Sequence, residues 1–251
     1  LAQCLESYLA LNARPWTDAL ALEGLNRAAR SLVPAFRDGS VLEARDDMAV
    51  AALLSGICLA NAGLGAVHGL AAALGGKFPI PHGVACGRVL PGVLSENIRA
   101  MIAGGAGRTV PAKCLRLAEV FLPARRGSEK TRMAALGDRL SAFVEELELP
   151  RLSAFGVTEA DLPVLAEAAG RSSSIRQNPV ALDEKTLIGI LRAASQPGLQ
   201  TRQAKTRIEI DHQAVVMVPG RKRSNPDDVL NRIRHIVHDA GRRIFDVRGA
   251  L

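Results

Sequence analysis

Apolar residues recur every three or four positions along most of this chain, which is the spacing of helices that bury one face. Glycine and proline clusters separate the apolar runs, and Pro15, Thr158 and Asp183 stand where helices are expected to begin. The predicted helices cover residues 1–12, 14–36, 43–64, 67–74, 82–102, 109–121, 130–148, 158–169 and 183–195. Aromatic residues make up only 3% of the chain, so its core must come from Ala, Leu and Val. Pattern and composition together predict an all-α, bundle-like fold for residues 1–195.

One apolar run, from Met48 to Leu64, raises the question of a membrane span. Its length is close to the roughly 17 residues of the shortest spanning helices. Ser55, Asn61 and two glycines interrupt the run, and no long cationic segment follows it. We therefore interpret it as the central buried helix of a helical domain and expect no membrane association.

The last fifth of the chain differs from the rest in charge. From Gln196 onward it carries 11 Lys or Arg residues and six Asp or Glu residues, so most of the formal net charge of +7 lies there. This shift predicts a boundary near Ser195, between a helical domain (residues 1–195) and a basic tail of unknown role (residues 196–251). The segment TRIEIDHQAVVMVPG alternates like a strand, and Asn225 followed by Pro226 is typical of a helix start. We expect the tail to be short mixed α/β structure or poorly ordered.

The tail also offers two weaker functional hypotheses. The segment GRKRSNP could bind nucleic acid or an acidic partner, but no aromatic residues are interleaved with its cations for base stacking. His235 and His238 lie three residues apart on the predicted helix, and no third metal ligand accompanies them. A solvated loop and a solvated helix face explain these features better, so nucleic acid is not the expected partner.

The cysteines and the first residues bear on the compartment. Cys4, Cys58, Cys86 and Cys114 form no CxxC pair and no tight cluster, which indicates reduced thiols. The chain begins without Met and without the features of a signal peptide, in what reads as the middle of a helix. We therefore expect a cytoplasmic protein and an N-terminally truncated fragment.

Two histidines stand in unusually apolar surroundings, in the stretch AVHGLAAALGGKFPIPHG. His68 and His82 are 14 residues apart, so they can meet only if the chain folds back between them. The intervening GGKFPIP favours such a reversal, with Gly75 and Gly76 expected to end one helix and His82 to open the next. Imidazoles from two adjacent helices could then hold a metal ion. Spacing alone favours two structural core histidines and leaves the metal site as the lesser alternative.

A longer stretch resembles a known family. NAGLGAVHGLAAALGGKFPIPHGVACGRVLPGVLSENIRA is similar to the metal-binding signature of the iron-containing (group III) alcohol dehydrogenases, through its VHG, LGG, PHG and VLP segments and Asn97. NPVALDEKTLIGILRAA is similar to the last helix of that family, and the resemblance extends over residues 1–195. Members have an N-terminal nucleotide-binding α/β domain and a C-terminal all-helical, dehydroquinate-synthase-like domain. This chain resembles the second domain only.

The resemblance implies a set of metal ligands. In the family, a divalent metal, Fe²⁺ or Zn²⁺, is held by one Asp and three His, of which His68 and His82 would be two. Gln3 occupies the position of the third His, and the position of the Asp falls ahead of Leu1. A further His that often lies near the nicotinamide in the family is Ala72 here. Gln3, His68 and His82 are the expected metal ligands, with Gln3 a weaker one because its amide is neutral.

The resemblance also implies a function. We expect a metal-dependent oxidoreductase domain that interconverts a small alcohol and an aldehyde with NAD(P), in a parent protein that forms homo-oligomers. GLGAVHG and GGAGRT lack the spacing and the preceding strand of dinucleotide loops, so NAD(P) would bind through a domain missing from this chain. The isolated chain is expected to be inactive. The alternative is a non-catalytic helical scaffold or interaction module with a degenerate metal site.

Overall fold

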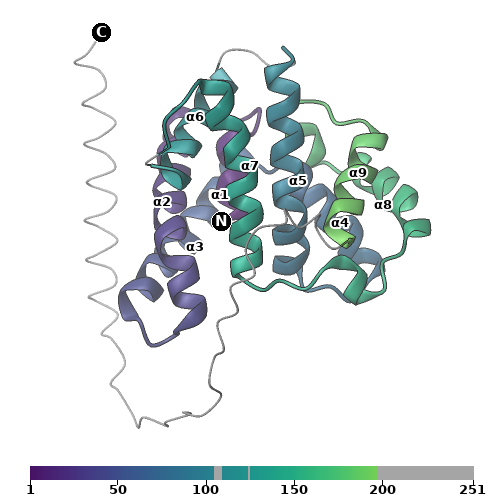
Figure 1. The fold of residues 1–251 in the computed structure, drawn as a ribbon, viewed down its shortest axis with the longest axis horizontal. Helices are drawn as coiled ribbons and strands as arrows, with labels where there is room; N and C mark the ends of the chain where they lie inside the picture. Colours follow the sequence, from purple (N-terminus) through teal and green to yellow (C-terminus); the bar gives the residue numbers. More distant parts are fainter. Residues whose placement is uncertain (105–108, 124, 197–251) are drawn as a thin grey trace. The chain divides into compact units, whose positions relative to one another are not determined.

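The structure is a computed structural model that describes residues 1–104, 109–123 and 125–196. Within these residues it contains nine α-helices, three short 3₁₀ helices and no strand (Figure 1), which confirms the predicted all-α fold. The α-helices are α1 (Ala2–Leu9), α2 (Pro15–Arg37), α3 (Leu42–Ala62), α4 (Ala66–Lys77), α5 (His82–Ile102), α6 (Thr109–Phe121), α7 (Glu129–Glu146), α8 (Leu162–Gly170) and α9 (Glu184–Ser195). The 3₁₀ helices are η1 (Leu152–Phe155), η2 (Glu159–Asp161) and η3 (Ile175–Gln177).

Most helix starts lie where the sequence signals put them. Pro15 is the first residue of α2, and the Asp183 carboxylate caps α9 by accepting a hydrogen bond from the Thr186 N–H at 2.8 Å. Thr158 instead heads the 3₁₀ turn η2, where its N–H and hydroxyl both donate to the Asp161 carboxylate. This turn leads directly into α8, which begins at Leu162. A helical segment therefore does begin after Thr158, as predicted, but its first turn is a 3₁₀ turn and not α-helical.

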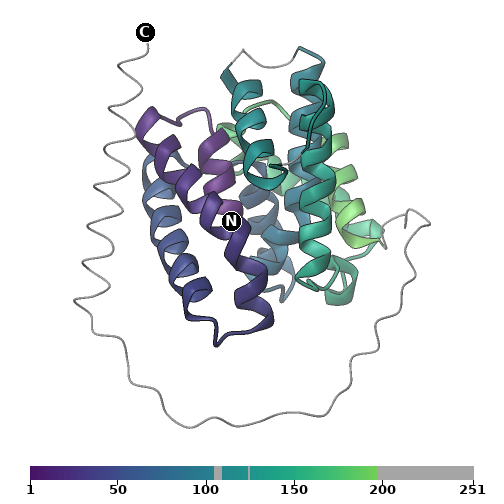
Figure 2. The ribbon, with the colours of Figure 1, turned by 60° about the vertical axis from the view of Figure 1, so that its left-hand side comes forward.

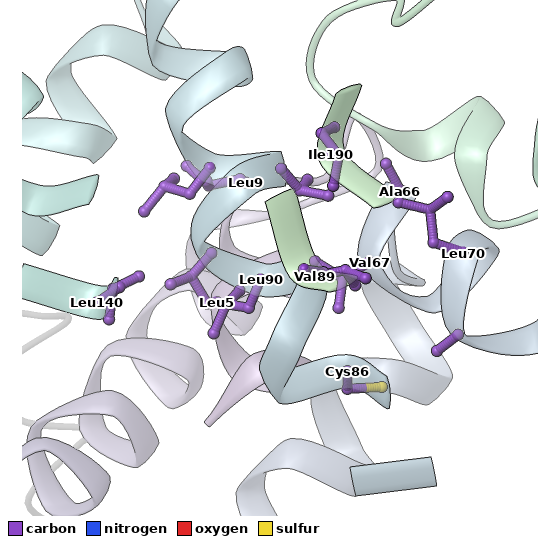
Figure 3. Close-up of a cluster of buried hydrophobic side chains, with 14 of the residues drawn as sticks. Leu5, Leu9, Ala66, Val67, Leu70, Cys86, Val89, Leu90, Leu140 and Ile190 are labelled. Carbon is purple, nitrogen blue, oxygen red and sulfur yellow. The ribbon is translucent and has the colours of Figure 1, made fainter. Parts of the chain in front are cut away.

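Helix α5 occupies the centre of the domain. It packs against α4, α6, α7 and α9, with α1, α2 and α3 on one side and α4, α8 and α9 on the other (Figures 1 and 2). Side chains from both groups meet around it in an apolar core built mainly of aliphatic residues (Figure 3). Leu90 and Val89 on α5 lie in this core with Leu5 from α1, Leu70 from α4 and Ile190 from α9. Helix α5 therefore carries His82 and packs against α4, which carries His68.

The interpretation of the apolar run on α3 as a central helix is wrong. Leu54 and Cys58 face the core, but Leu53 and Ile57 are 44% and 36% exposed. Helix α3 packs mainly against α2 and leaves an apolar face uncovered in the part of the chain that the structure describes. Taken one at a time, the described helices all fall short of the length and hydropathy of a membrane span. Helices α3 and α4 reach the length and hydropathy of a span only when they are taken together, and the angle between them is 100°.

Two short connections orient α4. Gly63 ends α3 with φ +78°, a backbone conformation in which other residues are strained, and the chain then turns into α4. After α4 the chain reverses through Phe78 to Pro81, and His82 opens α5 as predicted. Gly75 and Gly76 do not end α4, which continues to Lys77. The predictions for the strand-like segment, the helix after Asn225, His235 and His238 concern residues outside the described part of the chain.

Candidate metal centre

The α4–α5 hairpin brings His68 and His82 together. Their ring centroids lie 5.3 Å apart with 52° between the ring planes. His68 is 9% exposed, whereas His82, at the first position of α5, is exposed to solvent. The predicted reversal of the chain is therefore confirmed, and the two imidazoles face each other at the rim of the core.

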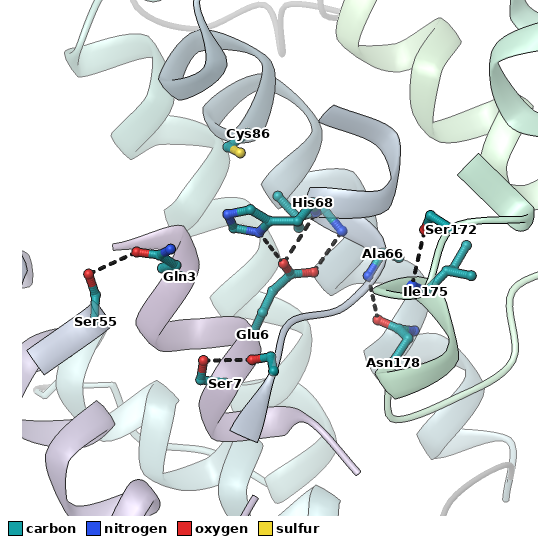
Figure 4. Close-up of polar contacts among 12 residues, drawn as sticks. Gln3, Glu6, Ser7, Ser55, Ala66, His68, Cys86, Ser172, Ile175 and Asn178 are labelled. Atoms are coloured by element: carbon teal, nitrogen blue, oxygen red, sulfur yellow. Dashed lines mark hydrogen bonds and ion pairs between the residues drawn. The ribbon is translucent and has the colours of Figure 1, made fainter. Parts of the chain in front are cut away.

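A buried carboxylate orients His68 (Figure 4). Glu6 on α1 is 5% exposed, and its Oε2 atom lies 2.5 Å from His68 Nδ1. The same carboxylate accepts hydrogen bonds from the backbone N–H groups of Val67 at 2.6 Å and His68 at 3.3 Å. Since a carboxylate only accepts, the proton of the imidazole lies on Nδ1, and the Nε2 lone pair is free to bind a metal.

The start of α4 is built to receive this carboxylate. A Cβ atom at Gly65 would lie 2.8 Å from Glu6 Oε1 and 2.9 Å from Asn178 Oδ1, closer than side chains approach. Asn178 accepts a hydrogen bond from the Ala66 N–H at 3.2 Å and donates one to Asn97 Oδ1 at 2.8 Å. Glu6 and Asn178 together satisfy N–H groups of the first turn of α4, where negative charge is favoured. The same Glu6 carboxylate therefore both caps α4 and orients the His68 ring.

Cys86 lies beside His82, one turn further along α5. Its Sγ atom is 3.4 Å from His82 Nε2. Ligand atoms of His68, His82 and Cys86 all lie within 4.8 Å of one another, which makes them the group of metal-binding side chains found in the described residues. The side chain is buried, and burial raises the pKa of the Cys86 thiol to about 12. Two imidazoles and a sulfur thus converge at the mouth of the α4–α5 hairpin.

Gln3 lies one turn before Glu6 on the same face of α1, as Figure 4 shows. Its Oε1 atom accepts a hydrogen bond from the Ser55 hydroxyl at 2.9 Å. The role of Gln3 as a metal ligand stays a prediction. Ala72 is exposed on α4, one turn after His68.

Sequence reasoning had not assigned two of the residues at this site. Glu6 is separated from His68 by 62 residues, and no local spacing pairs them. Cys86 could have been found, because His82 and Cys86 are four residues apart on a predicted helix, the spacing of neighbours on one face.

Known proteins are similar to this chain in sequence and fold. Alcohol dehydrogenase 4 of Saccharomyces cerevisiae is 34% identical over 198 residues, which are 77% of this chain and 48% of that protein. The 1,3-propanediol dehydrogenase of Citrobacter freundii is 37% identical over 199 residues, with the same shares of the two chains. A crystal structure of 1,3-propanediol oxidoreductase matches with a TM-score of 0.70 and 33% identity, over 77% of this chain and 49% of that one. The chain thus spans about half the length of the relatives it matches.

The matching part coincides with the helical domain described above. The model of the family described as "Fe-containing alcohol dehydrogenase family, C-terminal" matches residues 1–195. These residues hold all nine α-helices of the described part and the paired imidazoles of His68 and His82. Through this domain, the chain belongs to the Fe-containing alcohol dehydrogenase family.

Proposed function

We propose that this chain supplies the metal-binding half of an oxidoreductase that interconverts a small alcohol and an aldehyde with NAD(P). Relatives named as alcohol and 1,3-propanediol dehydrogenases support the substrate class. Because the chain spans about half of those proteins, the nicotinamide cofactor would be held by a separate domain. The free, buried thiols are consistent with a reducing compartment, and we place the protein in the cytoplasm.

The observation that carries this proposal is the Glu6–His68–His82 arrangement. The Nδ1–H group of His68 is held by Glu6, which leaves Nε2 as a donor, and the His82 ring faces it at 5.3 Å between centroids. Imidazole nitrogens suit both Fe²⁺ and Zn²⁺, so the donor chemistry fits the expected metal. When bound, such a metal supplies a Lewis acid that favours the alkoxide form of an alcohol.

The side chains around that metal would have different roles. Glu6 fixes the tautomer of His68 and holds its ring against rotation. The exposed position of His82 keeps one side of the site open to a substrate. Gln3 adds a neutral amide to the ligand set, on the side of α1.

The alternative is a non-catalytic scaffold that keeps this fold. Gln3 and Ala72 stand where the family resemblance implies imidazoles, and these two positions favour the alternative. A scaffold would retain the helical domain but bind metal weakly or not at all. Metal binding therefore separates the two functions.

The first experiment measures metal content. The full chain is loaded with Fe²⁺ or Zn²⁺, desalted and analysed beside His82→Ala and His212→Ala, the latter removing an imidazole that the proposal does not use. One bound metal in the parent chain and in His212→Ala, lost in His82→Ala, is the expected result. Absence of metal from the parent chain would support the scaffold.

The second experiment tests the reaction. The chain is joined to the N-terminal half of the Citrobacter freundii relative, the half that it does not span. We expect alcohol-dependent NAD reduction by the joined protein, its loss in His82→Ala, and no reduction by the chain alone. A joined protein that binds both metal and NAD but shows no turnover would contradict the proposed function.

A further inference from the structure

We propose that Cys86 is a protein ligand of the metal, so that this chain contributes His68, His82 and the Cys86 thiolate to the site. This inference rests on the proposed metal centre and changes its composition. The family resemblance implies one Asp and three His and gives no role to a cysteine. Here the structure places a sulfur beside the two imidazoles, at a site to which Gln3 offers only a neutral amide.

The distance between the donor atoms of Cys86 and His82 suits a tetrahedral site. Zinc–sulfur and zinc–nitrogen bonds at a tetrahedral angle put S and N about 3.5 Å apart. The Sγ atom of Cys86 and Nε2 of His82 are 3.4 Å apart, and His68 completes a set within 4.8 Å.

The positions of the three donors are fixed by different parts of the fold. His82 and Cys86 are successive residues on one face of α5, so the helix itself sets their separation. His68 is held from α1 by the Glu6 carboxylate. Cys86 is 4% exposed and lies among the apolar core side chains (Figure 3). His82, on the opposite side, is exposed to solvent. Donors on the buried side and an opening on the solvent side match a catalytic rather than a closed structural metal site.

Binding exchanges a proton for the metal. In the metal-free chain, the 3.4 Å contact serves as a hydrogen bond between the thiol and the His82 ring. When a divalent ion binds, the S–H bond breaks, the proton leaves to solvent, and the sulfur lone pair forms the bond to the metal. A donor set of two imidazoles and one thiolate favours Zn²⁺ over Fe²⁺ and Mn²⁺. The ligand class that this site takes is therefore a thiophilic divalent cation.

Cobalt(II) tests the ligand directly. The full chain is titrated with Co²⁺, and absorption is recorded in the visible region and in the near ultraviolet, where sulfur-to-cobalt charge transfer appears. The assigned cysteine is identified with Cys86→Ser and with a matched control, Cys114→Ser, which replaces another buried thiol on α6. A third variant, with Cys4, Cys58 and Cys114 all replaced by Ser, keeps Cys86 as its single thiol.

We expect the charge-transfer band in the parent chain, in Cys114→Ser and in the triple variant. In Cys86→Ser the band disappears, and the affinity for Zn²⁺ falls at least about tenfold, since even outer-shell changes cost that much. If Cys86→Ser does not fold, the triple variant still decides, because only Cys86 can give the band there.

Three results would count against the inference. Visible cobalt bands without charge transfer would mean that the metal binds through the imidazoles alone, and the proposed function would survive without Cys86. No cobalt bands in the parent chain, together with no metal uptake, would refute both Cys86 ligation and the proposed metal centre. A preference for Fe²⁺ over Zn²⁺ that is unchanged in Cys86→Ser would likewise count against a thiolate ligand.

Discussion

The Glu6 carboxylate and the His68 ring meet at 2.5 Å, although 62 residues separate them in the chain. Helix α1 supplies the acceptor, and the first turn of α4 supplies two backbone N–H donors and the ring. One buried residue therefore holds α4 in place and decides which nitrogen of His68 is available. Stability and metal affinity are coupled at this residue.

Replacement of Glu6 separates these two effects. In Glu6→Gln an amide oxygen still accepts from His68 Nδ1, but the charge is lost, and we expect metal affinity to fall about 10- to 100-fold. Glu6→Ala leaves buried donors unpaired at about 1–3 kcal/mol each, so the free energy of unfolding should fall as well. Chelator competition measures the affinity, and urea unfolding measures the stability.

A surface carboxylate provides the control for Glu6. Glu119→Gln removes charge from α6, where the side chain forms an exposed ion pair with Arg116. Both its metal affinity and its stability should remain within the range of the parent chain. Nitrogen NMR of the His68 ring adds a metal-free measurement, with the proton on Nδ1 in the parent chain. An Nε2–H tautomer in the metal-free parent chain would show that Glu6 does not determine the tautomer of His68.

Gly65→Ala should disturb the same contact from the opposite side. The new methyl group would lie 2.8 Å from Glu6 Oε1 and 2.9 Å from Asn178 Oδ1, so the carboxylate must move away from α4. We expect a loss of about 1–3 kcal/mol of stability and weaker metal binding. Gly56→Ala on α3, where nothing lies within 4 Å of a Cβ atom, is the matched control. Equal behaviour of the two variants would contradict the close packing at Gly65.

Neighbouring leucines on α3 test which face of that helix is buried. Leu54 is 3% exposed and Leu53 is 44% exposed. Leu54→Ala should lower the free energy of unfolding by about 2–4 kcal/mol, and Leu53→Ala by less than about 1 kcal/mol. Similar losses in both variants would restore the interpretation of α3 as a helix buried on every side. Chemical denaturation of the full chain measures both.

The fold was largely predictable because its signals are local. Apolar spacing located the helices, and Pro15 and Asp183 marked helix starts through chemistry contained within a few residues. The orientation of α3 was not predictable, because its apolar run has no polar face to show which side meets the core. Burial there depends on the neighbours of α3, and they come from distant parts of the chain.

The site was predictable only in part, for the same reason. Gly and Pro residues between His68 and His82 indicated a reversal, and the rings do meet. Glu6 acts across 62 residues, so its role depends on how the fold brings α1 to the first turn of α4. Cys86 was within reach of sequence reasoning through its spacing from His82, whereas its convergence with His68 required the fold.

A second polar cluster links α2 to α3, and its contribution to the free energy of unfolding should depend on pH. Asp47 on α3 is 6% exposed, and it accepts hydrogen bonds from Arg27, Arg30 and Ser31 on α2 at 2.6–2.8 Å. Burial by itself would raise the pKa of Asp47. The hydrogen bonds from Arg30 and Ser31 and the positive charges nearby outweigh burial and lower the pKa below the ordinary value of 3.8. The ionised carboxylate is therefore the form that stabilises the fold.

Asp47→Asn should destabilise the chain by about 2 kcal/mol at neutral pH, since Arg30 is half exposed and solvent screens part of the pairing. A lowered folded-state pKa means that this contribution is complete above pH 3.8 and is lost as pH falls through the folded-state value. The difference in unfolding free energy between parent and variant should thus be constant from pH 7 to about 5 and shrink in acid. Urea unfolding at constant ionic strength measures it.

Asp18 provides a comparison of opposite sign. Burial raises its pKa above 3.8 despite the hydrogen bond from Lys113, so the folded state binds the proton more tightly than the unfolded state does. The free energy of unfolding of the parent, relative to that of Asp18→Asn, should therefore increase as pH falls toward 3.8. The corresponding difference between the parent and Asp47→Asn should instead begin to shrink in the same range. Parallel pH profiles for the two variants would mean that general charge repulsion, rather than these two carboxylates, governs the acid response.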